Sequence, residues 1–330
     1  MMNHLENLCK LNSGSGRENA VREYILSAVG GRFETSVDVL GNLTVVKKGT
    51  SPDNGKVMLC AHMDEVALIC TAVKNDGTLA FGTVGAISPE VLIGRQVVSE
   101  SGITGIIGAK AVHNLKADEK EKPAELDDLY IDVGSEDKQY VSPGEYFYFP
   151  PVFKTFGENK IMGKAIDDRA GCAVLLDLLL NAEFKRDVLF SFTVQEELGL
   201  RGAKVLNSDA DFAVVAEATT AADIHGVKED KRVCELGKGA VVPFMDKGTV
   251  YDRALFDMAF ALAKENNIPC QTKSVIAGAN DAGAVHLSGN GIRTLSVSVP
   301  CRYIHSALGV ADIADIFAVR DLIKCVTASG

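Results

Sequence analysis

The sequence predicts an α/β protein with a mostly parallel central sheet flanked by helices and a small inserted domain resembling a β-barrel. Two regions of the 330 residues differ in pattern. After residue 161, apolar runs of strand length alternate with helical patterns, which is typical of a parallel sheet covered on both faces. Short alternating segments separated by turn residues occupy residues 67–160, which indicates an all-β insertion. We therefore expect one domain at 1–66 plus 161–330 and a second at 67–160.

The first unit begins with a helix and then becomes β-rich. Ser15 and Glu18 have the spacing of a capping box, and the helical pattern after them ends at Gly30. Strand-like runs follow at Ser36–Leu40, Leu43–Lys47 and Val57–Cys60. The last run leads into His62, so this side chain is expected at the tip of a buried strand.

The inserted segment has the turn residues of a small β domain. Turns are expected at 75–77, 101–102 and 142–144, and the aromatic run Phe147–Phe153 closes the segment. The charged stretch Lys116–Asp128 is expected to be a solvated loop without a function of its own.

Helices and strands alternate after residue 161. The expected elements are a helix at Arg169–Ala182, a strand at Val188–Val194, a short helix at Ala203–Leu206, a strand at Phe212–Ala216, a helix at Arg253–Asn266, a strand at Leu295–Val299 and a helix at Ile313–Val326. Sheets of this kind place their sites beyond the carboxyl ends of the strands. Polar residues at those positions are therefore the candidates for function.

Composition excludes several classes of protein. The formal charge is −10 and no Lys/Arg-rich run occurs, so nucleic acid is not an expected partner. The eight cysteines include no Cys-x-x-Cys pair, which is typical of small buried side chains in a reducing compartment. The apolar stretch Ala170–Leu180 is interrupted by Asp177 and is too short to span a bilayer, and no signal-peptide pattern opens the chain. We expect a cytoplasmic protein without a membrane partner.

Polar clusters stand where an apolar strand ends or a helix begins. They are His62/Asp64, Asp167/Asp168, Glu196/Glu197, Glu217 and His305. On a strand, residues two apart face the same side, so Asp64 can accept the proton of the second ring nitrogen of His62. An ordinary hydrogen-bonded pair at a strand end is the alternative interpretation.

The next two clusters also have structural alternatives. Asp167 and Asp168 precede a helix, where one carboxylate can cap the helix while the other binds metal. Glu196 and Glu197 can reach one cleft only if the chain is already turning, for which Gly199 is suited. One glutamate could then bind metal while the other takes a proton from water, and a solvated pair is the alternative.

The last two clusters are single residues. Glu217 follows the apolar run 214–216, where an unpaired charge would be costly, so a metal or a salt bridge is expected. His305 follows the strand Leu295–Val299 and could equally be a hydrogen-bonded loop histidine. The remaining histidines lack a partnered motif, and we expect a surface position for His4 and His113, a structural position on a helix for His286, and leave His225 open.

The residue types in these clusters suit one kind of chemistry. Two-metal hydrolases need a carboxylate that bridges both ions, terminal ligands on each ion, and a base for the attacking water. Imidazole nitrogen together with carboxylate oxygen suits zinc, and also cobalt or manganese. The sequence therefore indicates a hydrolase that uses two divalent metal ions.

Motifs around these clusters resemble a known family. They are Ala-His-Met-Asp-Glu-Val (61–66), Ala-Ile-Asp-Asp-Arg-Ala-Gly (165–171), Gln-Glu-Glu-Leu-Gly (195–199) and Arg-Tyr-Ile-His-Ser (302–306). Over nearly its whole length, the chain resembles the cytosolic metallo-aminopeptidases that include the tetrahedral and glutamyl aminopeptidases, some of which carry the label cellulase M. The segment 85–95 also looks like part of the inserted dimerisation domain of this family.

The resemblance implies a zinc-peptidase-like fold, two zinc or cobalt ions, and a cis peptide bond after the bridging aspartate. The implied roles are a bridging carboxylate at Asp167, ligands of one ion at His62 and Glu217, ligands of the other ion at Glu197 and His305, a general base at Glu196, and an orienting carboxylate at Asp64. The family often has Asp where this chain has Glu217. Residues 277–282 match the family's Gly-Gly-Thr-Asp-Ala motif only loosely, which leaves the role of Asp281 open.

The implied activity is removal of the N-terminal residue from short peptides, by a homo-oligomer in which dimers assemble into a dodecamer. A di-zinc deacylase or carboxypeptidase on a similar scaffold would use the same ligand types. A glycosidase needs two carboxylates across a sugar groove, and the absence of Trp leaves no aromatic platform for one. A non-enzymatic scaffold would be indifferent to chelators. The sequence sets neither the preferred first residue nor the native metal.

Overall fold

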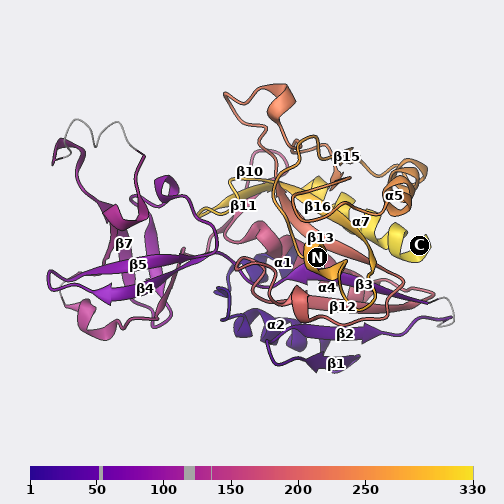
Figure 1. Ribbon diagram of the computed structural model, residues 1–330, viewed down its shortest axis with the longest axis horizontal. Coiled ribbons are helices and arrows are strands. Elements are labelled where there is room, and N and C mark those ends of the chain that lie inside the picture. Colours follow the sequence, from indigo (N-terminus) through magenta and orange to yellow (C-terminus); the bar gives the residue numbers. More distant parts are fainter. Residues whose placement is uncertain (52–54, 115–122, 135, 330) are drawn as a thin grey trace.

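The computed structural model describes residues 1–51, 55–114, 123–134 and 136–329. Most of these residues build one large 11-stranded sheet with its helices, and the remainder form a separate barrel that projects from one end (Figure 1). The strands of the large sheet are β1 (Glu34–Val37), β2 (Leu43–Lys47), β3 (Lys56–His62), β10 (Phe153–Phe156), β11 (Lys160–Gly163), β12 (Asp187–Thr193), β13 (Phe212–Thr220), β14 (Ala240–Val242), β15 (Cys270–Thr272), β16 (Arg293–Arg302) and β17 (Gly309–Asp312).

The middle of the large sheet is parallel, as predicted. The main path runs β1-β2-β12-β3-β13-β16-β17-β11-β10, and β14 pairs with β15 and β16. Strands β12, β3, β13 and β16 pair in parallel with their neighbours in this order, whereas the strands towards both ends of the main path pair antiparallel. Strands β3, β12 and β13 are buried along nearly their whole length, which explains their almost continuous apolar runs.

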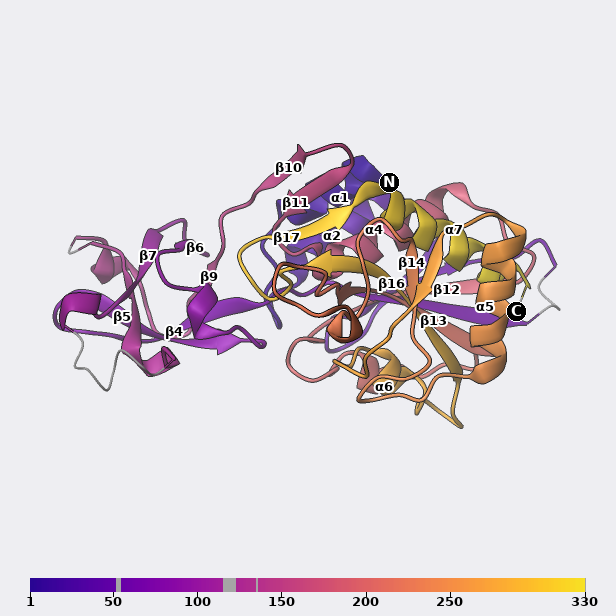
Figure 2. The same cartoon turned by 90° about the horizontal axis from the view of Figure 1, so that it is seen from above.

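Helices cover both faces of this sheet. The α-helices are α1 (Met2–Cys9), α2 (Asn19–Val29), α4 (Ile166–Asn181), α5 (Arg253–Glu265), α6 (Ala282–Val285) and α7 (Ile313–Ser329). Figure 2 shows α4 and α7 above the sheet and α6 below it. Nearly every side chain of α4 is buried, because β3 and β13 pack on one side of the helix and α1 and α7 pack on others. The sheet and its helices enclose one continuous apolar core.

The inserted region forms a closed barrel with the strand order β4-β5-β8-β7-β6-β9. Its strands are β4 (Ala67–Val73), β5 (Thr78–Val84), β6 (Gln96–Ser99), β7 (Thr104–Ala109), β8 (Leu129–Asp132) and β9 (Tyr146–Tyr148). The barrel has its own apolar core, to which Leu79, Ile131 and Phe147 contribute. The prediction of a small β-barrel-like insertion is confirmed. Its predicted limits stay a prediction, although β10 and β11 already belong to the large sheet.

Several local predictions are wrong. Ser15 does not cap a helix, since α2 begins at Asn19 without a side-chain cap; Gly30, in the left-handed conformation, ends it as expected. The N-terminal helix α1 was not predicted. The strand expected at Ser36–Leu40 lies at β1, four residues long. His4 is half-buried and lies 2.9 Å from the Tyr24 hydroxyl.

Short 3₁₀ helices connect the larger elements. They are η2 (Pro89–Val91), η3 (Val112–Asn114), η4 (Leu126–Asp128), η5 (Asp137–Tyr140), η6 (Ala203–Val205) and η7 (Glu229–Lys231). The short helix expected at Ala203–Leu206 is thus a single 3₁₀ turn. Of the loop expected at Lys116–Asp128, residues 116–122 lie outside the described part of the chain. None of the helices in the described ranges is long and apolar enough to cross a membrane, and all eight cysteines are free thiols.

Candidate active site

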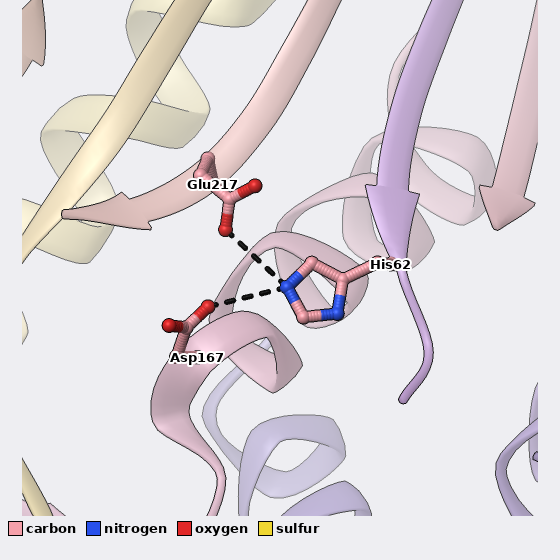
Figure 3. A group of neighbouring side chains, drawn as sticks. All are labelled: His62, Asp167 and Glu217. Atoms are coloured by element: carbon pink, nitrogen blue, oxygen red, sulfur yellow. Dashed lines mark hydrogen bonds and ion pairs between the residues drawn. The ribbon is translucent and has the colours of Figure 1, made fainter. Parts of the chain in front are cut away.

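The candidate site lies where two neighbouring strands separate. Strands β3 and β13 pair in parallel from Val57 to Cys60 on the β3 side, and no further. Beyond this point β13 continues alongside β16 as far as Thr220, so a gap opens between β3 and β13 at their carboxyl ends. His62, the last residue of β3, and Glu217, within the extended part of β13, face each other across this gap (Figure 3). The strand expected to stop at Ala216 therefore continues through Glu217.

Three side chains converge on this gap from three different elements. The Nε2 atom of His62 lies 3.2 Å from Oδ1 of Asp167 and 3.5 Å from Oε1 of Glu217 (Figure 3). The His62 side chain is 2% exposed. Asp167 comes from the start of α4, so the group combines the ends of two strands and a helix.

A second group shares Asp167 with the first. The other oxygen of this carboxylate, Oδ2, lies 3.6 Å from Nε2 of His305. The same His305 nitrogen lies 3.4 Å from Oε2 of Glu197. One carboxylate therefore faces two imidazoles, one with each oxygen, which is the arrangement that a carboxylate bridging two cations requires.

The two aspartates at the start of α4 have different partners. The helix path is interrupted at this point, where neither Asp167 nor Asp168 has helical torsion angles, and the peptide bond between them is cis, as the resemblance implied. Asp168 Oδ1 accepts the N–H of Gly171 and Oδ2 accepts the N–H of His62. Asp168 thus accepts hydrogen bonds from the start of α4 and from the end of β3, whereas Asp167 faces the two histidines.

Asp64 holds several parts of the site together. Its carboxylate accepts the backbone N–H groups of Glu196 at 3.0 Å and Glu197 at 3.1 Å, and the hydroxyl of Ser15 donates to it at 2.6 Å. The Nδ1 atom of His62 lies 3.1 Å from the Asp64 carbonyl and 3.4 Å from its carboxylate Oδ1. Burial alone would raise the pKa of Asp64, but the hydrogen bonds from His62, Ser15 and Glu196 lower it. The donors around this buried carboxylate stabilise its ionised form.

The chain turns sharply after β12, which brings both glutamates to the same region. Gln195 has φ +55° and Gly199 has φ +98°, and the N–H of Gly199 donates to the carbonyl of Glu196 at 2.8 Å. On a regular strand, Glu196 and Glu197 would point to opposite faces. The turn instead places an oxygen of each within 4.8 Å of a ring nitrogen of His62. The predicted turn is confirmed.

Burial and mutual repulsion dominate the electrostatics of this cluster. Burial raises the pKa of Glu196 well above its usual value, that of Glu197 to about 8 and that of Glu217 to about 7. For Asp167 burial acts in the same direction, but the hydrogen bonds to His305 and His62 outweigh it and lower the pKa. Within the described residues, no Lys or Arg forms an ion pair with any of these carboxylates. The cluster thus concentrates buried acids with few cations to balance them.

This donor set fits divalent metal ions. Three overlapping groups have ligand atoms within 4.8 Å of one another, namely His62/Asp167/Glu217, His62/Glu196/Glu197 and Asp167/Glu197/His305. Mixed imidazole and carboxylate donors suit zinc, cobalt or manganese. Bound cations would also relieve the repulsion between carboxylates that raises their pKa values.

The seven residues for which the resemblance implied a role come together here, namely His62, Asp64, Asp167, Glu196, Glu197, Glu217 and His305. Sequence reasoning missed the contact of Ser15 with Asp64. It also left Asp281 open, and the structure buries this residue with Oδ2 against the Thr193 hydroxyl and Oδ1 without a partner among the described residues.

The other histidines take no part in the cluster. His113 and His225 are exposed. The ring of His286, at the end of α6, lies 2.8 Å from the carbonyl of Ala282, in agreement with the structural role predicted for it.

Comparison with known proteins adds independent evidence. The family described as M42 glutamyl aminopeptidase matches residues 41–322. A putative aminopeptidase of Acetivibrio thermocellus is 33% identical over 94% of both chains, and the lysyl aminopeptidase of Pyrococcus furiosus is 31% identical over 89% of this chain and 86% of its own.

Solved structures of peptidases also superpose on this chain. The aminopeptidase APDkam598 from Desulfurococcus kamchatkensis superposes with a TM-score of 0.93 at 30% identity and covers 99% of this chain and 94% of its own. The TET1 peptidase of Pyrococcus horikoshii, which can assemble into a tetrahedron or a large octahedral shell, gives a TM-score of 0.85 at 30% identity and covers 100% of this chain and 99% of its own.

Fold, site and relatives together define a peptidase, an enzyme that hydrolyses peptide bonds. The chain belongs to the M42 glutamyl aminopeptidase family.

Proposed function

We propose that this chain is a two-metal aminopeptidase that removes the N-terminal residue from short peptides. The position of Asp167 between two histidines, with one carboxylate oxygen directed at each, carries this proposal. His62, Asp167 and Glu217 would hold one ion, and Asp167, Glu197 and His305 would hold the other. When bound, zinc or cobalt ions would acidify a water molecule and polarise the carbonyl of the peptide bond.

Glu196 is the general base in this proposal. Its carboxylate lines the cavity beside the cluster and receives no hydrogen bond from the described residues. The backbone N–H of Glu196 is fixed on Asp64, so the side chain starts from a defined position. A glutamate carboxylate in this position can accept a proton from the attacking water and can afterwards donate that proton to the amine that leaves.

The surroundings of the cluster suit a free amino end. Glu197 and Glu217 lie on either side of Asp167, and either carboxylate can face the ammonium of a substrate. An N-acetylated peptide has no positive charge to place there. This difference separates an aminopeptidase from a deacylase or carboxypeptidase built on the same ligands.

One experiment tests the proposed function directly. Release of the first residue is measured for an unblocked peptide and for its N-acetylated counterpart, before and after removal of metal by a chelator. We expect cleavage of the unblocked peptide only, loss of activity on chelation, and recovery with zinc or cobalt. Cleavage of the acetylated peptide would instead assign the chain to deacylase or endopeptidase chemistry, and activity that survives chelation would exclude the metal mechanism.

We also propose a homo-oligomer, with dimers that assemble into a dodecamer, in the cytoplasm. The structural neighbour that forms a tetrahedral assembly supports the oligomer, and the free buried cysteines suit a reducing compartment. Sedimentation of the purified protein measures the number of copies. A monomer at micromolar concentration would contradict the proposed assembly.

A further inference from the structure

The turn that carries Glu196 and Glu197 is held in place by side chains. Strand β12 ends at Thr193, and the N–H groups of the next four residues donate to side-chain oxygens. The acceptors are Asn42 for Val194 at 3.0 Å, Glu18 for Gln195 at 3.1 Å, and Asp64 for Glu196 and Glu197. Side chains from three distant parts of the chain therefore set the path of this turn.

Glu18 holds the residue that comes directly before the proposed base. This residue, Gln195, has φ +55°, a left-handed conformation that is unfavourable for a residue with a Cβ atom. Oε1 of Glu18 accepts the N–H of Gln195 at 3.1 Å and the N–H of Gly16 at 2.7 Å, and Glu18 is 3% exposed. A buried N–H group without an acceptor is costly, so loss of this oxygen would favour another path of the backbone through Gln195.

The spacing of Ser15 and Glu18, which resembles a capping box, thus serves the site and not the helix. The hydroxyl of Ser15 donates to Asp64, and the carboxylate of Glu18 accepts the N–H of Gln195. Helix α2 begins at Asn19, and the Glu18 side chain makes no capping hydrogen bond to it. A change of the Glu18 side chain should therefore leave α2 intact.

We propose that Glu18 is a positioning residue for Glu196. Glu18 accepts the N–H of Gln195 and Asp64 accepts the N–H of Glu196, so the peptide units on both sides of Gln195 are held. The side chain of Glu196 thereby approaches the attacking water from a fixed direction. Glu18 lies outside the three groups of possible metal ligands and acts through the backbone of the turn. This inference rests on the proposed aminopeptidase function, in which Glu196 is the base.

The test compares Glu18→Ala, which removes the acceptor, with Glu18→Gln, which keeps an oxygen for it. The kcat and KM of the zinc- or cobalt-loaded enzyme are measured with the amino-acid p-nitroanilide that the wild type cleaves fastest. We expect Glu18→Ala to lower kcat by about 10- to 100-fold, because small displacements of a reacting group have effects of this size. The KM and the content of two ions should stay near the wild-type values, and Glu18→Gln should restore most of kcat.

A second measurement does not depend on activity. Hydrogen exchange of the Gln195 amide should become faster in Glu18→Ala and stay slow in Glu18→Gln, because only the former removes its acceptor. Asp252→Ala is the matched control, since it removes a carboxylate that accepts the N–H of Leu255 at the start of α5. This control should leave kcat and the exchange of Gln195 near the wild-type values.

Each outcome bears on one of the two proposals. The role of Glu18 is overturned, while the aminopeptidase function stands, if Glu18→Ala keeps the kcat of the control or if Glu18→Gln is impaired as much as Glu18→Ala. Loss of metal together with kcat, or unchanged exchange at Gln195, would also overturn it. If the loaded wild type releases no residue from any unblocked substrate, the aminopeptidase function fails and the role of Glu18 fails with it.

Discussion

The two ends of the proposed metal cluster differ in how firmly the fold holds them. The inner half, His62 and Glu217, lies on two buried strands, and the His62 side chain is 2% exposed. The outer half, Glu197 and His305, lies on two turns, and the His305 side chain is 34% exposed. His305 stands on the loop between β16 and β17 with φ +56°.

Hydrogen bonding follows the same division. The Nδ1 atom of His62 contacts the Asp64 carbonyl oxygen. The carboxylate of Asp64 in turn accepts the N–H groups of Glu196 and Glu197. Within the described chain, Nδ1 of His305 has no such partner. A ligand whose second nitrogen is bound is fixed in tautomer and orientation. We therefore expect the inner half to be preformed and the outer half to adjust when an ion or a substrate binds.

The largest expected effect on kcat is at Glu196, the proposed general base. Glu196→Gln should lower kcat by about 10²- to 10⁴-fold, because an amide cannot take the proton from water. Both ions should stay bound, since His62 and His305 are unchanged. Steady-state kinetics and metal analysis measure the two results, with the exposed Glu183→Gln as the control. Activity close to wild type would remove Glu196 from the role of base.

The next test compares the two histidines directly. His62→Ala and His305→Ala should both abolish most of the activity, but only the former should destabilise the metal-free protein. Loss of the His62 ring removes the partner that lies 3.2 Å from Oδ1 of Asp167, which costs about 1–3 kcal/mol, whereas Oε1 of Glu217 keeps the N–H of Ala218. His305→Ala, at a partly exposed loop position, should change the free energy of unfolding by about 0.5 kcal/mol or less. Equal losses in denaturant unfolding would show that the halves do not differ in rigidity.

A smaller effect, on metal affinity, is expected at Asp64, which contacts His62 of the inner half and Glu197 of the outer half. Asp64→Asn should weaken metal binding by about 10- to 100-fold, the usual range when the partner of a ligating histidine is changed. The amide still has an oxygen for one of the two backbone N–H groups, so the fold should survive. Metal titration of the variant measures the effect, with the exposed Asp257→Asn as control. Wild-type affinity would mean that the Asp64 carbonyl alone orients His62.

The elements that carry the cluster differ in how far sequence could predict them, and this difference does not follow the two halves. The strand ending at His62 and the turn near Gly199 were predictable, because continuous apolar runs and glycine are local signals. The extension of β13 through Glu217 was not, since it depends on pairing with β16, about 80 residues further along the chain. The β10–β11 hairpin was missed for the same reason, as β11 is ordered by its pairing with β17.

Lys273, which lines the cavity beside the cluster, shows a second limit of prediction from sequence. Nothing in its neighbourhood along the chain marks it as a cavity residue, and only the fold brings it to the same cavity as Glu196. Asp281 is similar, because its partner Thr193 lies 88 residues away. Residues that bind through a strand end can be found from sequence, whereas residues that line the walls of a cavity need the three-dimensional structure.

The smallest predicted effect concerns Ser15, whose spacing from Glu18 wrongly indicated a helix cap. Ser15→Ala removes one of several hydrogen bonds to Asp64, worth about 0.5–1.5 kcal/mol, so kcat/KM should fall by about 2- to 12-fold. Ser13→Ala is the matched control, because its buried hydroxyl donates to the Met63 carbonyl and not to Asp64. Helix α2 should be unaffected in both variants, as judged by circular dichroism. If Ser15→Ala weakened metal binding as much as Asp64→Asn does, the hydroxyl, and not the two backbone N–H groups, would hold Asp64 in place.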